Sequence, residues 1–223
     1  NDNPQALYAL GYAYLCMEVY DEAISHYQAS LLMDHSFEDA ANDLIHCAHI
    51  QEKTEIAITF FKEQIDKNPY ASIFWGYLGL AYNEKSDFSQ ASNAFEYATI
   101  TDPDNGQAYA DWGHALMNLE QYQKAEEVYL EAQRLLGESP SLYCHLGASK
   151  EREGKAQEAF RYYKKASVLD KQYDNAWYGM GMCMIQTKNW MEAVQFFKQA
   201  IKINRFSDDY WLQMAIAEYE LGN

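Results

Sequence analysis

The chain has 223 residues, of which 33 are acidic and 17 basic, so its formal net charge is −16 and its isoelectric point is near 4.6. Nucleic acids and anionic membrane surfaces bind clustered Lys and Arg, so this charge argues against both as partners. No apolar run approaches the roughly 18 residues that a membrane-spanning helix needs, so we expect no membrane insertion.

An interval of 34 residues runs through the chain. In chain order, short apolar runs contain a glycine whose positions differ by 34 residues or by a multiple of 34. An alanine and an aromatic residue each recur every 34 residues without a gap. The alanine and the ring are four residues apart, which puts them on one helical face. The repeat therefore predicts a succession of helical units. The three series are Gly11, Gly79, Gly113, Gly147 and Gly181; Ala23, Ala57, Ala91, Ala125, Ala159 and Ala193; and Tyr27, Phe61, Phe95, Tyr129, Tyr163 and Phe197.

The third unit gives the fullest pattern, with Trp75, Leu78, Gly79, Tyr82, Ala91, Phe95, Ala98 and Pro103. This order of residues resembles the motif of the tetratricopeptide repeat family. The resemblance implies an all-α fold, a right-handed α-solenoid (superhelix) of antiparallel helix pairs that bury their apolar stripes against their neighbours. We expect a single array over residues 1–223, with complete repeats at 4–37, 38–71, 72–105, 106–139, 140–173 and 174–207 and a partial repeat at 208–223.

Single residues predict local features of these helices. Glycine within a helix costs roughly 1 kcal/mol relative to alanine, so Gly79 predicts a close approach of two helices whose packing offsets that cost. Asn3 and Ser139 each precede a proline, the arrangement of an N-cap residue followed by proline in the first turn. We therefore expect helices to begin at these two places.

Two places depart from the family pattern. In the second repeat Ala41, Ile45 and Ala48 replace a large, a small and a large residue, so volume is exchanged between positions and we expect altered curvature there. In the fifth repeat Lys150 replaces an aromatic residue or leucine. We expect its stem to follow the edge of the core while its amine reaches water.

The end of the chain and its cysteines bear on the protein's context. Residues 208–223 have the first-helix pattern and leave Trp211 and Met214 uncovered, whereas a terminal repeat usually carries a polar capping helix, so we expect a longer parent protein.

The four cysteines lie in separate repeats without a CxxC pair, and we interpret them as small buried residues of a protein in a reducing, cytoplasmic compartment. They are Cys16, Cys47, Cys144 and Cys183.

The family resemblance also implies a binding surface. In the family, the first helix of each pair lines a concave groove, and six positions of that helix face the ligand. Carried over residue by residue, these positions predict a partner-binding groove of Tyr8, Tyr12, Asp39, Asn42, Asp43, His46, His49, Tyr77, Asn83, Glu84, Asp111, His114, Asn118, His145, Arg152, Tyr178 and Met182. Arg152 is the only Lys or Arg that faces inward on this mapping.

The chemistry of this groove indicates the kind of partner. Family members that bind the acidic C-terminal tails of chaperones use inward Lys, Arg and Asn, whereas the corresponding positions here include Tyr8, Tyr12, Asp43 and Tyr77, so we expect no such carboxylate clamp. Aromatic residues supply contact area and acids supply electrostatic steering. We therefore expect a protein–protein interaction scaffold that binds a neutral or basic peptide segment or helix of a partner.

Two alternatives stay open. The chain could self-associate into a homo-oligomer through the apolar surface at Trp211, Met214 and Leu221, or bind a metal or small ligand at mid-groove histidines such as His114 and His145. Neighbouring helix axes lie about 8–10 Å apart, so two histidines that are separated by two repeats cannot bind the same ion. The sequence has no glycine-rich phosphate loop, nucleophile elbow or HExxH motif, so we expect no catalytic residues, enzyme activity, cofactor or metal.

Overall fold

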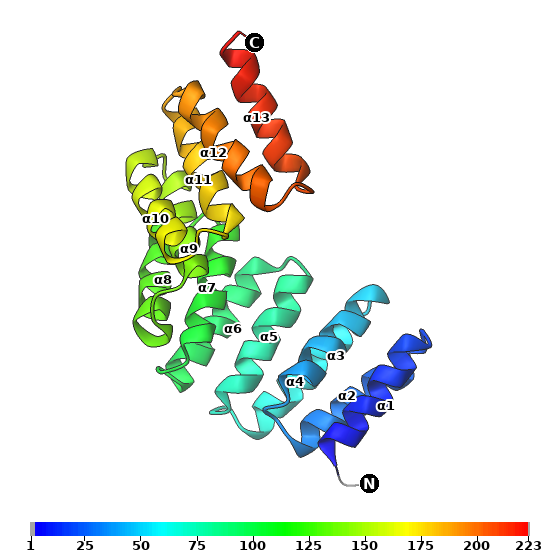
Figure 1. Ribbon diagram of the computed structural model, residues 1–223. Coiled ribbons are helices and arrows are strands. Elements are labelled where there is room, and N and C mark those ends of the chain that lie inside the picture. The colour runs from blue at the N-terminus through cyan, green and yellow to red at the C-terminus, as the bar shows by residue number, and fades with distance from the viewer. Residues whose placement is uncertain (1–2, 223) are drawn as a thin grey trace. The chain divides into compact units, whose positions relative to one another are not determined.

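The computed structural model describes residues 3–222, which form thirteen α-helices and contain no β-strand (Figure 1). The first helices are α1 (Pro4–Cys16), α3 (Glu38–Ile50), α5 (Ser72–Glu84), α7 (Gly106–Asn118), α9 (Pro140–Arg152), α11 (Asp174–Gln186) and α13 (Asp208–Glu220). The second helices are α2 (Tyr20–Met33), α4 (Glu55–Lys67), α6 (Phe88–Thr101), α8 (Tyr122–Leu136), α10 (Ala156–Leu169) and α12 (Trp190–Ile203). Every first helix begins at the residue where the 34-residue interval placed the start of a repeat.

Both predicted N-caps are confirmed. The side-chain oxygen of Asn3 accepts hydrogen bonds from the backbone N–H groups of Gln5 and Ala6, and the Ser139 hydroxyl accepts one from the N–H of Leu142 at 3.1 Å. These bonds satisfy N–H groups that have no partner within the first turn of a helix.

The turn after each first helix has a feature that sequence reasoning missed. One residue in every turn adopts the left-handed conformation, with φ between 57° and 83°, and these residues are 34 apart: Glu18, Glu52, Ser86, Glu120, Gly154, Lys188 and Gly222. In the turns at Glu18, Glu52, Ser86, Gly154 and Lys188, the N–H of the next residue reaches back to a helix carbonyl, as from Val19 to Tyr14 at 2.9 Å. This geometry closes the helix C-terminus in a Schellman-type turn.

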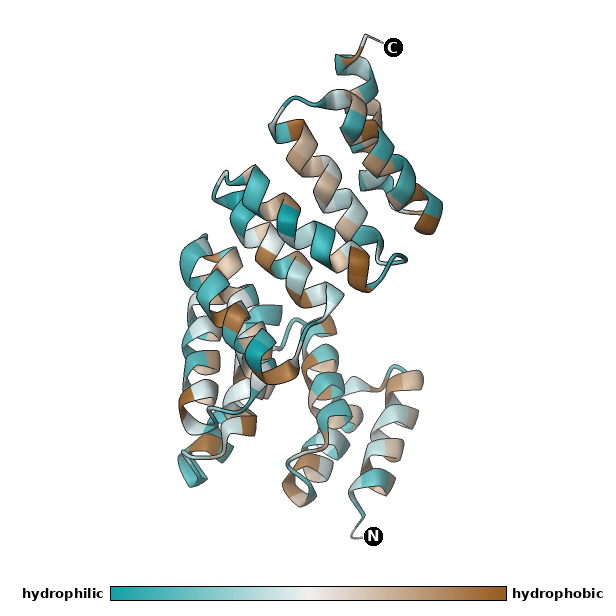
Figure 2. Cartoon of the chain, turned by 60° about the vertical axis from the view of Figure 1, so that its left-hand side comes forward, coloured by the Kyte–Doolittle hydropathy of each residue, from teal (hydrophilic) through white to brown (hydrophobic). Residues whose placement is uncertain are grey.

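The chain forms two compact units. The N-terminal unit covers residues 1–119 and contains α1 to α7, and the C-terminal unit covers residues 120–223 and contains α8 to α13. In both units the alanine and ring series are buried, for example Ala91 and Phe95 in the first and Ala193 and Phe197 in the second. Hydrophobic and hydrophilic residues occur on the same helices (Figure 2). This is expected of helices that pack against neighbours on one side and face solvent on the other.

Close packing at the glycine positions is confirmed. A Cβ atom on Gly79 would lie 2.6 Å from the Phe95 ring, and one on Gly181 would lie 2.4 Å from the Phe197 ring. In the second repeat Ile45 stands at the glycine position and Phe61 at the ring position, and α3 and α4 pack less closely than α5 and α6. The exchange of volume in this repeat therefore opens the helix pair locally, because an isoleucine cannot occupy the space that a glycine leaves to the ring.

The expectation for Lys150 is wrong. Its residue is only 7% exposed, and its Nζ lies 2.5 Å from Glu126 and 3.6 Å from Glu153, with Glu158 at 3.9 Å and Lys155 pairing with Glu153. We call these five residues the Lys150 cluster. Burial alone would lower the pKa of Lys150, but the hydrogen bond and the charge of Glu126, with the other carboxylates, raise it above its ordinary value.

The cysteines agree with their interpretation in three cases of four. Cys47, Cys144 and Cys183 are buried and free, and burial raises the pKa of the Cys47 thiol to about 11. Cys16, at the last position of α1, is exposed, so the interpretation is wrong there.

Candidate partner-binding groove

The first helices of the N-terminal unit form one acidic surface, which we call the first-helix face. α5 contacts both α3 and α7, so these helices lie side by side (Figure 1). None of α1, α3, α5 and α7 contains a Lys or Arg. Their acids are Glu38, Asp39, Asp43, Glu84 and Asp111. The face therefore presents negative charge without a cation of its own helices.

Asp111 has the most perturbed carboxyl group of this face. Its pKa is raised to about 6, chiefly by burial and also by the charge of Glu38. The hydrogen bond from Gln107 Nε2 to its Oδ1 at 3.0 Å acts in the opposite direction. Glu38 belongs to α3 and Asp111 to α7, so acids from separate helices act on one another across α5. A cation placed between them would be stabilised by both.

A second group surrounds Asp43 of α3. The Tyr8 ring lies 4.8 Å from the Phe37 ring and 6.5 Å from the Tyr12 ring, measured between centroids. Partial burial and the charge of Asp43 raise the pKa of Tyr8 to about 12. Tyr12 is 52% exposed. The tyrosine pair of α1 thus offers aromatic surface next to a carboxylate.

The other predicted residues of this unit differ in how much surface they offer. Side chains of the following residues are exposed: Asp39, Asn42, His46, His49, Glu84, His114 and Asn118. Asn83 is half-buried. Tyr77 is only 5% exposed, packs on Phe61 and Phe74, and donates its hydroxyl to the His35 carbonyl at 3.4 Å. It is mainly a packing residue. Although His114 keeps an exposed edge, the surrounding protein desolvates its ring, which lowers its pKa and keeps the imidazole neutral to lower pH.

Most predicted groove residues of the C-terminal unit pack against neighbouring side chains of the same unit. The His145 ring stacks on Tyr129 at 5.2 Å and lies 3.1 Å from the Ser141 hydroxyl. Tyr178 stacks on Tyr210 at 4.9 Å. Met182 packs against the core of α12, and Arg152 is exposed. Of these four residues, Arg152 offers the most accessible side chain.

Two acids at helix starts lie outside the predicted groove residues. Glu38 acts on Asp111, and Asp174 accepts hydrogen bonds from the Tyr210 hydroxyl at 2.9 Å and from Asn204 at 3.0 Å. Both stand at the first position of a repeat, outside the six positions that the family pattern assigns to ligands. Their position in the first turn was the available signal, because acids are favoured there.

The alternative of a metal site gains no support. Among residues 3–222, no three His, Cys, Asp or Glu side chains come close enough together to hold a metal ion. Over the same residues, no helix is both long and apolar enough to cross a membrane.

Comparisons with known proteins agree with the pattern of the sequence. Models described as "Tetratricopeptide repeat" match residues 6–41, 77–141 and 152–218. Human Protein O-mannosyl-transferase TMTC3 is 24% identical over 182 residues, which cover 75% of this chain and 20% of that protein. The chain thus spans about a fifth of the length of this curated relative.

Solved structures share the fold. The APC/C hetero-tetramer Cut9–Hcn1 superimposes with a TM-score of 0.68 at 17% identity, covering 91% of this chain and 40% of that one. YrrB, described as a TPR protein with an unusual peptide-binding site, superimposes with a TM-score of 0.65 at 19% identity, covering 86% of this chain and 97% of that one. At such identities the likeness concerns the fold alone.

Proposed function

Because the chain belongs to the tetratricopeptide repeat family, whose members are generally protein-interaction scaffolds, we propose that it binds a partner along the first-helix face of its N-terminal unit and is not an enzyme. The ligand is a neutral or basic segment of a protein, extended or helical. The observation that carries this proposal is a face with five acids and no Lys or Arg on its four helices.

The contacts of the face suggest how such a segment is held. Tyr8 and the exposed Tyr12 supply aromatic area at one end, beside the carboxylate of Asp43. A Lys or Arg of the ligand pairs with Asp111 and Glu38 at the other, which returns the pKa of Asp111 from about 6 toward its ordinary value. Binding of a basic segment is therefore accompanied by proton release near pH 6.

The test uses three fluorescein-labelled peptides of equal length that contain Tyr and Leu and are otherwise rich in Lys, neutral, or rich in Glu. Fluorescence anisotropy is measured at low salt and at about 0.5 M salt, where exposed charge attraction is strongly screened. We expect the Lys-rich peptide to bind tightest at low salt. The double variant Asp43→Asn/Asp111→Asn should weaken it by about tenfold, because two charge contacts are lost.

A matched variant controls for net charge. Glu63→Gln/Asp104→Asn also removes two charges from the N-terminal unit, but from an exposed position of α4 and from the loop before α7. It should bind the Lys-rich peptide like the unchanged protein. Equal binding by both double variants, or preference for the Glu-rich peptide on this face, would contradict the proposal.

A second candidate function, self-association, is favoured by α13. Its exposed apolar side chains include Trp211, Leu212 and Ile216, and Trp211 is 47% exposed. Light scattering across a concentration series measures the mass in solution. A mass that rises with concentration, and returns to the monomer value in Trp211→Ser/Ile216→Ser, would support a structural assembly unit.

A further inference from the structure

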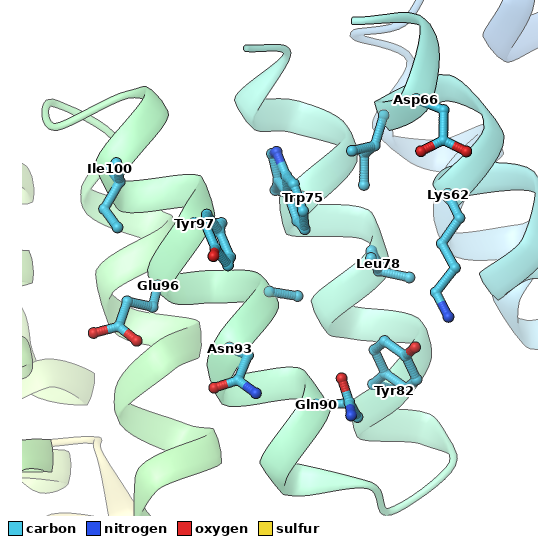
Figure 3. Close-up of a pocket in the computed structure, with 12 residues that line it drawn as sticks. Lys62, Asp66, Trp75, Leu78, Tyr82, Gln90, Asn93, Glu96, Tyr97 and Ile100 are labelled. Atoms are coloured by element: carbon cyan, nitrogen blue, oxygen red, sulfur yellow. The ribbon is translucent and has the colours of Figure 1, made fainter. Parts of the chain in front are cut away.

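Two hollows on the side of the second helices occupy equivalent places in different repeats. The first, which we call the α6 groove, has a volume of about 700 Å³ and is bordered by α4 and α6, with Trp75 of α5 at its floor (Figure 3). The second, the α10 groove, has a volume of about 440 Å³ and is formed by α10, Tyr143 of α9 and Glu138. Tyr143 lies two repeats of 34 residues after Trp75.

Five repeat positions line both grooves, and the residues at these shared positions differ in charge. The shared positions on α6 are Asn93, Glu96, Tyr97 and Ile100. Figure 3 shows Tyr97 beside Trp75. At the same repeat positions α10 carries Arg161, Lys164, Lys165 and Val168. Three bases have thus replaced an amide, an acid and a tyrosine.

The bases of the α10 groove are available to a ligand. Arg161, Lys164 and Lys165 are all exposed, and in the described part of the chain no ion pair joins any of them to an acid. Lys165 Nζ lies 5.1 Å from the centre of the Tyr143 ring and 5.8 Å from that of Tyr162, a cation–π arrangement that keeps its ammonium over the groove.

The groove also has one acid and exposed apolar surface. Glu138 accepts a hydrogen bond from the Tyr143 hydroxyl at 2.6 Å, so one carboxylate faces three cations. Val168 is 70% exposed and Leu169 is 47% exposed. Arg161, Lys165 and Val168 are spaced i, i+4 and i+7, which places them along one side of α10.

We propose that the α10 groove is a second binding site, for an acidic segment of a partner protein. The segment places carboxylates against Arg161, Lys164 and Lys165 and an apolar side chain against Val168 and Leu169. A short peptide fits better than a long polyanion, because three cations complement a few carboxylates while the strongly negative chain repels nucleic acid and anionic membranes. Together with an acidic first-helix face, this groove would let one chain hold two partners of opposite charge.

The probe is a fluorescein-labelled peptide of Glu residues with two Leu residues, measured by fluorescence anisotropy at low salt. Arg161→Glu/Lys165→Glu should raise its Kd by about tenfold or more, because attraction becomes repulsion at two contacts. The control Lys188→Glu/Lys202→Glu makes the same charge change elsewhere in the C-terminal unit. Glutamate suits position 188, because Glu18, Glu52 and Glu120 adopt the same left-handed conformation in other repeats. This control should keep the Kd within about twofold.

A gain of binding tests the position-by-position match. Asn93→Arg/Glu96→Lys places two bases at the equivalent positions of the α6 groove. Combined with Arg161→Glu/Lys165→Glu, it should restore part of the binding of the Glu-rich probe. Far-UV circular dichroism during heating checks that each variant remains folded, which we expect since all four changed side chains reach the surface or its edge.

Several outcomes would overturn the proposal. The probe could bind the Arg161→Glu/Lys165→Glu variant as tightly as the unchanged protein, or lose affinity equally in the control. A probe with both Leu residues replaced by Ser could bind equally well, which would leave no role for Val168 and Leu169. Tighter binding to phosphatidylserine vesicles or duplex DNA, with the same dependence on Arg161 and Lys165, would assign the groove to another class of partner.

Discussion

Buried or half-buried acids have different neighbours in the two units. Acids paired with a cation belong to the folded structure, whereas acids without one are available to bind a ligand. In the C-terminal unit, the carboxylates of Glu126 and Glu153 surround the buried amine of Lys150. In the N-terminal unit, Asp111 is also buried in part, but its charged neighbour is Glu38, another acid. A compensated charge leaves no ion unpaired in the fold, whereas an uncompensated acid costs stability unless a ligand supplies the cation.

The two regions should therefore respond in opposite ways to acid. The pKa of Glu153 is lowered by Lys155 and Lys150, so its contribution is present at neutral pH and is lost as the pH falls below the ordinary range of glutamate. The pKa of Asp111 is raised to about 6, so its cost is absent at low pH and appears as the pH rises through that value. Between neutral pH and about pH 5, the N-terminal unit gains stability while the Lys150 cluster keeps its ion pairs.

The largest effect is expected for Lys150→Met. This change leaves the half-buried carboxylates of Glu126 and Glu153 with only Lys155 to compensate them. Removing the buried amine from this cluster should lower the free energy of unfolding by about 3 kcal/mol. Urea titration followed by circular dichroism measures the loss. Adding Glu126→Gln should recover part of it, because the second change removes one of the stranded charges.

An exposed ion pair provides the control for Lys150. Lys85 pairs with Glu55, and both side chains are largely exposed. Lys85→Met should therefore cost much less stability than Lys150→Met. If the two lysine variants lost similar stability, the buried cluster would have no special structural role and the comparison between the two units would fail.

A smaller effect of opposite sign is expected for Asp111→Asn. The amide oxygen can still accept from Gln107, but the charge that is costly above about pH 6 is gone, so the variant should be more stable by about 1 kcal/mol at pH 7.5. Near pH 4.5 the carboxyl group is already protonated, so the gain should vanish. Thermal melts at both pH values test this. Asp104→Asn, at an exposed loop position, should change little at either, and a gain for Asp111→Asn that is independent of pH would contradict the assignment.

The helices could be predicted from the sequence because local signals agree with one another. The 34-residue interval, the N-caps at Asn3 and Ser139, and the glycine that faces Phe95 all depend on residues close together in the chain or in equivalent repeats. The left-handed turn residues could not be predicted in this way. Glu, Ser and Lys carry no signal for that conformation, and glycine marks it only at 154 and 222.

The charges were harder to predict than the helices, because their partners are distant in sequence. Lys150 is buried through Glu126 of α8, which precedes it by most of a repeat. Asp39 and Glu84 are exposed at family positions, but Tyr77 packs inward on Phe61. Glu38 acts on Asp111 from a position that the family pattern leaves out. Side-chain burial and the sign of neighbouring charges require the packed structure.

The smallest predicted effect concerns Glu38→Gln. Burial is the main cause of the raised pKa of Asp111, and the charge of Glu38 adds to it across α5, so removing that charge should lower the pKa from about 6 by only part of a unit. Carboxyl carbon shifts in an NMR titration measure it. Asp39→Asn removes the neighbouring acid, which is not among the causes of the shift, and serves as the control. An unchanged pKa of Asp111 in Glu38→Gln would mean that the charges of α3 and α7 do not act on each other. A basic ligand would then interact with Asp43 and Asp111 separately and not with one continuous acidic face.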